Sequence, residues 1–110
     1  MKVLFLPEVQ QYYDNLEQIL YEKGYFSFPD SSKKYVKELV NDIKANLPVK
    51  LKKKAPEYFT DRYGEGLYYA IFPKNKRTQW YVFFRMYEKG GELYYQVRYI
   101  GNNHVIAQYL

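Results

Sequence analysis

The sequence predicts an α+β fold in which a helical hairpin packs on one face of a mainly antiparallel sheet, in the order β-α-α-β-β-β. Two observations carry this prediction. Apolar residues recur every three or four positions in the first half of the chain, as in amphipathic helices, and every two positions in the second half, as in half-buried strands. At 110 residues, without an internal repeat or a linker, the chain is expected to form a single domain, residues 1–110.

A short strand and a first helix are expected at the start of the chain. The strand covers residues 2–6 and should end at Pro7, because proline suits the first position of a helix. The helix should continue to about Gly24. Its apolar stripe consists of Val9, Tyr12, Tyr13, Leu16, Ile19 and Leu20.

A loop at residues 26–34 should lead into a second helix. Asp30, Ser31 and Ser32 are good N-cap candidates, and the helix should stop before Pro48, since the residue before a proline disfavours the helical conformation. The apolar stripe of this helix consists of Tyr35, Val36, Leu39, Val40 and Ile43. We expect the two helices to pack against each other as a hairpin.

The rest of the chain reads as a basic segment followed by three strands. Residues 49–66 begin with a lysine run and are expected to be irregular. Strands are expected at residues 67–72, 79–87 and 92–100. The sequences between them, PKNKRT and EKGG, are typical of turns, so the three strands should form an antiparallel meander.

Alternation along the strands assigns the side chains to faces of the sheet. The residues expected to face the helices from the middle strand are Trp80, Val82, Phe84 and Met86, and the outward set is Tyr81, Phe83, Arg85 and Tyr87. The more apolar set of the last strand is Leu93, Tyr95, Val97 and Tyr99. One exposed face should therefore collect Tyr81, Arg85, Tyr94, Gln96 and Arg98. Arginine and tyrosine suit phosphates and unstacked bases, whereas an ordinary solvated sheet face is the alternative.

Composition favours a polyanionic partner and argues against several other classes of protein. The net charge is +5, and 15 tyrosines offer rings for stacking, although tyrosine also simply fills half-buried strands. The absence of cysteine and the single histidine argue against a disulfide framework and a metal site. No apolar run approaches the length of a membrane span, and the first residues lack signal-peptide features. We therefore expect a cytoplasmic protein without cofactor, metal or membrane partner.

The chemistry that these residues offer is metal-free acid–base chemistry. RNA cleavage needs a base for the 2′-hydroxyl, positive charge for the phosphate and an acid for the departing 5′-oxygen. His104 is the only histidine, and it follows Asn102 and Asn103 directly after the last strand. An imidazole can carry out either proton transfer, whereas the two asparagines are expected to be turn residues that tolerate the left-handed conformation.

The element order, the basic segment before the meander and the ending YYQVRYIGNNHVIAQYL resemble the RelE/ParE superfamily of toxins from bacterial type II toxin–antitoxin systems. This resemblance implies one of two activities. RelE-like members are messenger-RNA endonucleases (mRNA interferases) that act on the ribosome, and ParE-like members inhibit DNA gyrase. The expected partners are a cognate antitoxin protein and messenger RNA on the ribosome, or DNA gyrase in the alternative. A homodimer is also compatible with the resemblance.

The same resemblance points to individual site residues. Tyr109 lies eight positions after Gly101, the spacing of the catalytic tyrosine in RelE-like enzymes. The lysines of the family would correspond to Lys50, Lys52, Lys53 and Lys54. Two arginines of the family are replaced by Tyr81 and Asn103, and His104 could substitute for the second of them.

We therefore assign His104 and Tyr109 to proton transfer and Arg85 and Arg98 to stabilisation of the phosphate. The expected RNA-binding residues are Lys50, Lys52, Lys53, Lys54, Tyr81, Tyr94, Gln96 and Asn103. Three alternatives stay open. Tyr109 could simply pack at the end of the chain, the two replaced arginines favour a gyrase inhibitor or a catalytically inactive interaction protein, and the exposed face could bind single strands generically.

Overall fold

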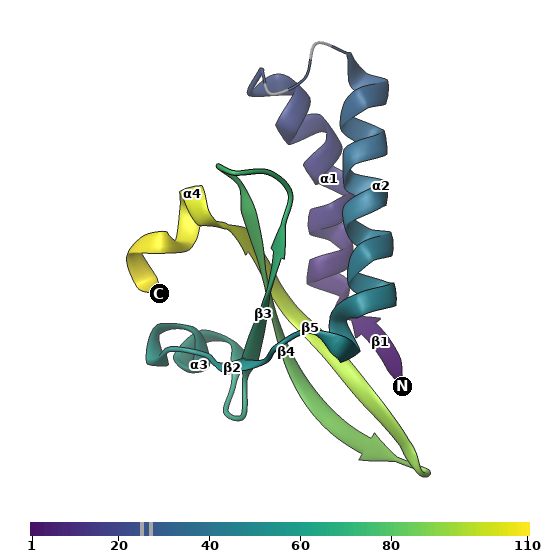
Figure 1. The fold of residues 1–110 in the computed structure, drawn as a ribbon, viewed down its shortest axis with the longest axis vertical. Coiled ribbons are helices and arrows are strands. Elements are labelled where there is room, and N and C mark those ends of the chain that lie inside the picture. Colours follow the sequence, from purple (N-terminus) through teal and green to yellow (C-terminus); the bar gives the residue numbers. More distant parts are fainter. Residues whose placement is uncertain (25, 27) are drawn as a thin grey trace.

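A five-stranded sheet with the strand order β1-β5-β4-β3-β2 forms the centre of the computed structural model, which describes residues 1–24, 26 and 28–110 (Figure 1). The strands are β1 (Lys2–Phe5), β2 (Lys53–Lys54), β3 (Tyr68–Pro73), β4 (Gln79–Lys89) and β5 (Glu92–Asn102). β1 runs parallel to β5, and every other pair is antiparallel. The protein is thus α+β as predicted, with a mixed sheet in which β3, β4 and β5 form the expected meander.

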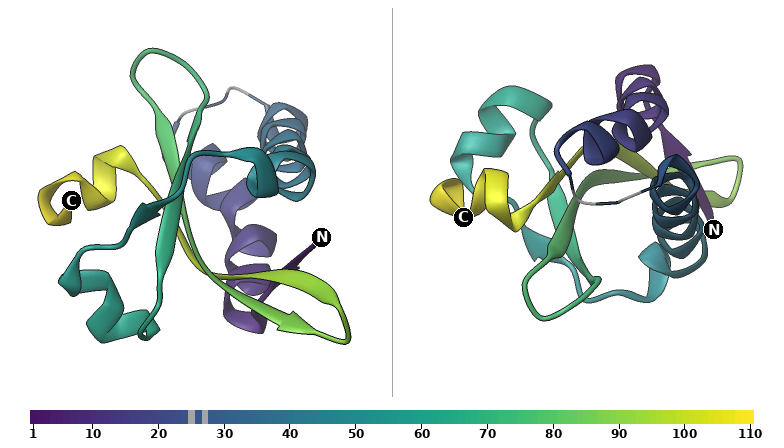
Figure 2. Two further views of the ribbon diagram at one scale, coloured as in Figure 1. Left: turned by 60° about the horizontal axis from the view of Figure 1, so that its bottom comes forward. Right: turned by 90° about the horizontal axis from the view of Figure 1, so that it is seen from above.

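Helices α1 (Pro7–Glu22) and α2 (Pro29–Asn46) form the predicted hairpin on one face of the sheet (Figures 1 and 2). The assignment of an N-cap to Asp30, Ser31 or Ser32 is wrong, because α2 already begins before them, after an extended Phe28. Ser32 instead is buried and donates a hydrogen bond to the main-chain carbonyl of Glu17, which ties the two helices together. Residue 27 of the expected loop lies outside the described residues.

The main core lies between the hairpin and the sheet. Leu39 and Ile43 of α2 and Leu47 of the short 3-10 helix η1 (Leu47–Val49) have no exposed surface. The prediction that the alternate residues of β4 face the helices is confirmed for Trp80, Val82, Phe84 and Met86. The 3.6-residue period of the helices and the two-residue period of the strand therefore converge on one apolar layer.

The segment at residues 49–66 is not irregular, contrary to expectation. It contains β2 and the helix α3 (Glu57–Tyr63), which ends at Gly64 with φ +109°. Phe59 of α3 is 1% exposed, and its ring stacks on Phe83 of β4 with 4.2 Å between centroids. This tertiary contact stabilises a helix that is too short to be stable alone.

Helix α3 and the C-terminal helices α4 (Asn103–Ile106) and η2 (Ala107–Tyr109) lie on the sheet face opposite the hairpin (Figure 2). A second apolar cluster lies beneath them. Its buried members are Phe59, Leu67, Phe83 and Ile106. The expectation that this face is exposed is therefore wrong for Phe83, which has no exposed surface. Part of the face is covered, and only the part beyond α3 remains open.

A β-bulge at Arg98 changes the facing of the last strand. Phe84 pairs with Val97, but Phe83 pairs with Tyr99, so that Arg98 is an extra residue in β5. The assignment of Tyr99 to the set of Tyr95 and Val97 is wrong, because this extra residue shifts the alternation by one position. Tyr99 lies in the second cluster instead, whereas Ile100 joins the core beneath the hairpin.

Candidate functional site

The Gly101–His104 stretch is a junction between the end of β5 and the β3–β4 turn. Asn102 is the N-cap of α4, and its Oδ1 accepts a hydrogen bond from the Val105 main-chain nitrogen at 3.2 Å. Asn103 Oδ1 accepts from the Gln79 nitrogen at 2.9 Å, and its Nδ2 donates to the Arg77 carbonyl at 3.0 Å. The predicted left-handed turn is wrong, since no non-glycine residue in the described ranges has a positive φ.

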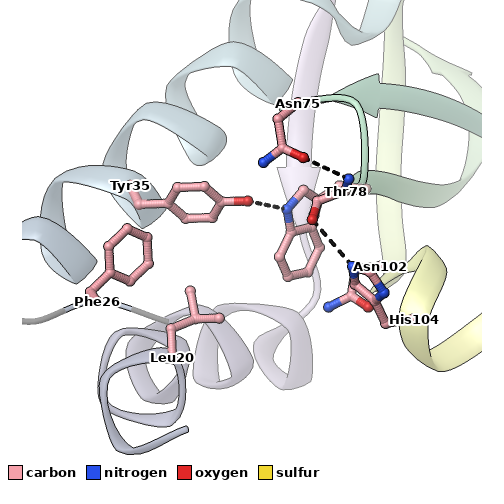
Figure 3. Close-up of a pocket in the computed structure, with 8 residues that line it drawn as sticks. Leu20, Phe26, Tyr35, Asn75, Thr78, Asn102 and His104 are labelled. Carbon is pink, nitrogen blue, oxygen red and sulfur yellow. Dashed lines mark hydrogen bonds between the residues drawn. The ribbon is translucent and has the colours of Figure 1, made fainter. Parts of the chain in front are cut away.

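His104 is exposed and lies at the rim of a cavity of about 230 Å³ (Figure 3). Its Nε2 lies 3.2 Å from the hydroxyl of Thr78 in the β3–β4 turn. The cavity is lined by Leu20, Phe26, Tyr35, Asn75, Thr78, Trp80, Asn102 and His104. Of these residues only His104 was singled out as a site residue from the sequence, because the others come from elements that only the folded structure brings together.

Tyr35 and Trp80 connect the hairpin to the sheet inside this cavity. The indole Nε1 of Trp80 donates a hydrogen bond to the Tyr35 hydroxyl at 2.8 Å. Burial raises the pKa of Tyr35, and the hydrogen bond from Trp80 counteracts this only in part. The Tyr35 hydroxyl therefore keeps its proton at neutral pH.

Tyr109 lies on the other side of the sheet, where it packs against α3. Its ring stacks on Tyr58 at 3.7 Å between centroids and meets the edge of Phe59 at 6.4 Å. The guanidinium carbon of Arg62 lies 3.6 Å from the centroid of the Tyr58 ring, and Arg62 Nη1 donates to the Tyr58 carbonyl at 2.9 Å. Arg62 and Tyr58 are thus residues near Tyr109 that the sequence did not reveal, because α3 was not expected.

Arg85, Gln96 and Arg98 are brought together on the open part of the face that carries α3. Gln96 lies opposite Arg85 in the sheet, and its Oε1 accepts a hydrogen bond from Arg98 Nε at 3.0 Å. Arg98 Nη1 donates to the carbonyl of Tyr63, the last residue of α3, at 2.8 Å. With the stacked ring pair Tyr87–Tyr94, these side chains form what we call the arginine surface: Arg85, Tyr87, Tyr94, Gln96 and Arg98.

Other predicted RNA-binding residues lie elsewhere. Tyr81 is half-buried in the second cluster, 5.9 Å from the ring of Tyr69, rather than on the arginine surface. The ammonium groups of Lys50 and Lys52 lie over rings of the main core, those of Phe72 and Tyr95.

The two lysines of β2 point to opposite faces of the sheet. Lys53 pairs with Tyr69, which belongs to the second cluster, and Lys54 pairs with Tyr68, which packs against the main core. Both are exposed, at the edge of the sheet. The lysine run is therefore divided between two faces and does not form one cationic cleft.

Tyrosines make up most of the partly buried residues that pack against the second cluster. Burial, followed by the neighbouring Tyr63, raises the pKa of Tyr99 to about 12.

Within residues 1–24, 26 and 28–110, no three His, Cys, Asp or Glu side chains are grouped so that they could hold a metal ion. The part of the chain that the structure describes also contains no helix long and apolar enough to cross a membrane.

Comparisons with known proteins return no match for this chain. No protein-family model, no curated protein and no solved structure matches it.

Proposed function

We propose that this chain is a toxin of a bacterial toxin–antitoxin pair of the RelE/ParE type, and that it cleaves messenger RNA on the ribosome without a metal ion. The main support is the stack of Arg62, Tyr58 and Tyr109, in which a cation lies on the far face of the ring that Tyr109 stacks on. Tyr109 is the tyrosine that the sequence resemblance assigns to catalysis, and an arginine in the same stack supplies positive charge for the phosphate.

In this proposal, Tyr109 accepts the proton of the 2′-hydroxyl, and Arg62 and the arginine surface bind the RNA backbone. Solvent water protonates the departing 5′-oxygen. Arg85 is exposed, and Arg98 is held by Gln96 and by the Tyr63 carbonyl, so its position is fixed before RNA arrives. His104 lines a cavity between the hairpin and the β3–β4 turn, whereas Tyr109 packs on α3 across the sheet. We therefore drop His104 from the catalytic set and keep Tyr109 in it.

Primer extension on translating ribosomes tests this proposal. Tyr109→Phe keeps the ring and removes the hydroxyl, and cutting should fall by at least about a hundredfold, as for loss of an acid–base group. His104→Ala should cut like the wild type. Equal cutting by the wild type and Tyr109→Phe would show that Tyr109 is not catalytic. No cutting by the wild type would contradict the proposed endonuclease activity.

A second candidate is a non-catalytic inhibitor of the same fold, for example one that acts on DNA gyrase. It is favoured by the tight stacking of Tyr109, which gives this residue a structural role without any catalysis. A gyrase supercoiling assay separates the two candidates. Inhibition by both wild type and Tyr109→Phe, without RNA cutting, would establish the second.

A further inference from the structure

We propose that the cavity between the hairpin and the β3–β4 turn binds one uridine nucleotide unit, with the uracil ring inside and the phosphate at the turn formed by residues 74–78. This inference does not depend on the proposed toxin activity, because the cavity lies on the hairpin side of the sheet, away from Tyr109. Three donor groups of the lining remain available, because the side-chain oxygens of Asn75, Asn102 and Tyr35 already accept hydrogen bonds within the protein.

Two asparagines present only their amide nitrogens to the cavity. Asn75 Oδ1 accepts from the main-chain nitrogens of Arg77 at 2.8 Å and Thr78 at 2.9 Å. Asn102 Oδ1 accepts from the Val105 nitrogen. A main-chain N–H can pair only with the oxygen of an amide, so these contacts fix which way each amide points. Neither Nδ2 has a hydrogen-bond partner among the described residues, and Figure 3 shows both side chains at the cavity.

Tyr35 adds a third donor. Its hydroxyl oxygen already accepts the indole hydrogen of Trp80, which leaves its own hydrogen to donate. The three donors come from α2, the β3–β4 turn and the end of β5, so a ligand that accepts from them would connect the hairpin to the sheet. A group that brings only donors, or no polar atoms, would leave them unpaired, which lowers affinity.

The walls of the cavity suit a planar ring. The rings of Phe26 and Tyr35 lie 5.3 Å apart, and the third wall is the 1% exposed Trp80. A volume of about 230 Å³ accommodates one ring. A lone carboxylate of a partner protein would satisfy the donors but leave these aromatic walls uncovered. Uracil offers a planar ring with two carbonyl acceptors on either side of N3–H. Cytosine has as many acceptors, O2 and N3, but carries an amino donor where uracil has O4. We therefore assign the Asn102 amide to O4, the position at which the two bases differ.

Positive charge at the mouth of the cavity suits the phosphate of such a nucleotide. The β3–β4 turn carries Lys74, Lys76 and Arg77, and the ammonium of Lys74 lies 5.6 Å from the centroid of the Tyr35 ring. No described aspartate or glutamate lines the cavity. Free uridine monophosphate and a uridine within single-stranded RNA share this chemistry, and the experiment separates them.

Ligand binding in this cavity can be followed with the unlabelled protein, because Trp80 is its only tryptophan and His104 its only histidine. Tryptophan fluorescence and the imidazole NMR signals should both change on titration with uridine monophosphate. Cytidine monophosphate should bind about tenfold more weakly, the cost of one mismatched polar contact. Tighter binding of oligouridylate than of the mononucleotide would assign RNA as the source, and equal binding would assign the free nucleotide.

Asn102→Asp is the decisive variant. The aspartate keeps the oxygen that caps α4, so the fold should be retained, but it replaces the donor in the cavity by an acceptor. The added charge repels both phosphates alike, so the ratio of the two affinities isolates the hydrogen bond. This ratio should shift by about tenfold toward cytidine monophosphate. Equal wild-type affinities for the two nucleotides, an unchanged ratio in Asn102→Asp, or benzoate binding as tight as uridine monophosphate would each overturn the proposal.

Discussion

The rings of Tyr58 and Tyr109 lie parallel, with 3.7 Å between their centroids and 9° between their planes. Because Tyr109 occupies one face of Tyr58 at stacking distance, the guanidinium of Arg62, 3.6 Å from the same centroid, must cover the other face. The pair joins α3 to η2 above the second cluster, so the end of the chain is held by a ring rather than by main-chain pairing with the sheet. The same ring is the proposed catalyst, and its two roles can be separated by mutation.

Removing the Tyr109 ring should destabilise the protein, whereas removing only its hydroxyl should not. We expect Tyr109→Ala to lower the free energy of unfolding by about 1–3 kcal/mol, through lost apolar burial and the lost aromatic pair. Tyr109→Phe should stay within about 0.5 kcal/mol of the wild type. Urea denaturation measures both. Equal losses in the two variants would show that the hydroxyl, not the ring, holds the C-terminal segment.

The parts of the fold that follow from local periodicity could be predicted from the sequence. The helix stripes that contain Leu39 and Ile43, and the alternation of Trp80, Val82 and Phe84, each depend on a regular repeat that no distant contact disturbs. These elements define the hairpin, the meander and the main core. They also place Arg85, Gln96 and Arg98 on one face, as the sequence predicted.

The other features of the fold and of the site depend on tertiary contacts that leave no periodic signal in the sequence. α3 is only 7 residues long and is held by Phe59, and the bulge at Arg98 reverses the facing of Tyr99 without any mark in the alternation. The cavity was missed because its polar groups come from the β3–β4 turn, α2 and the end of β5. Its donor character depends on which atom of Asn75 and Asn102 is already paired, which only the folded structure shows.

A side chain at Gly64 should destabilise the connection between α3 and the sheet. Gly64 has φ +109°, and a Cβ there would lie 2.7 Å from Arg98 Nη1. Gly64→Ala should therefore cost about 1–3 kcal/mol, the range for backbone strain of this kind. The cost should shrink by at least about 0.5 kcal/mol in an Arg98→Ala background, because the clash disappears, but the backbone strain should remain. A double-mutant cycle in urea that finds the two changes additive would contradict the contact.

Tyr13 offers a stabilising substitution. Its side chain is 3% exposed, and its hydroxyl has no hydrogen-bond partner among the described residues. Tyr13→Phe should raise the free energy of unfolding by about 1 kcal/mol, because an unpaired polar group leaves the core. Tyr35→Phe is the matched control. It should lower the free energy of unfolding, because it removes the acceptor of the hydrogen bond from the buried Trp80 indole. A loss of stability in Tyr13→Phe would show that the hydroxyl is satisfied.

Alkaline pH should lower the free energy of unfolding, in part through Tyr99 of the second cluster. Burial, with Tyr63 as the next cause, raises the pKa of Tyr99 to about 12, compared with about 10 for tyrosine in an unfolded chain. Between these two values the unfolded state releases the proton while the folded state retains it. The stability that this group contributes is therefore complete below about pH 10 and is lost as the pH rises toward about 12.

Urea unfolding at a series of alkaline pH values, followed together with tyrosinate absorbance, measures this loss. Tyr99→Phe should make the decline shallower without removing it, because burial also raises the pKa of Tyr12 and Tyr63. The absorbance should show one late-titrating tyrosine fewer in Tyr99→Phe than in the wild type. If the stability of both proteins falls with the same slope against pH, Tyr99 ionises as readily in the folded state as in the unfolded state. The second cluster would then be more open to water than the packing of the Tyr99 ring against Phe59 and Phe83 indicates.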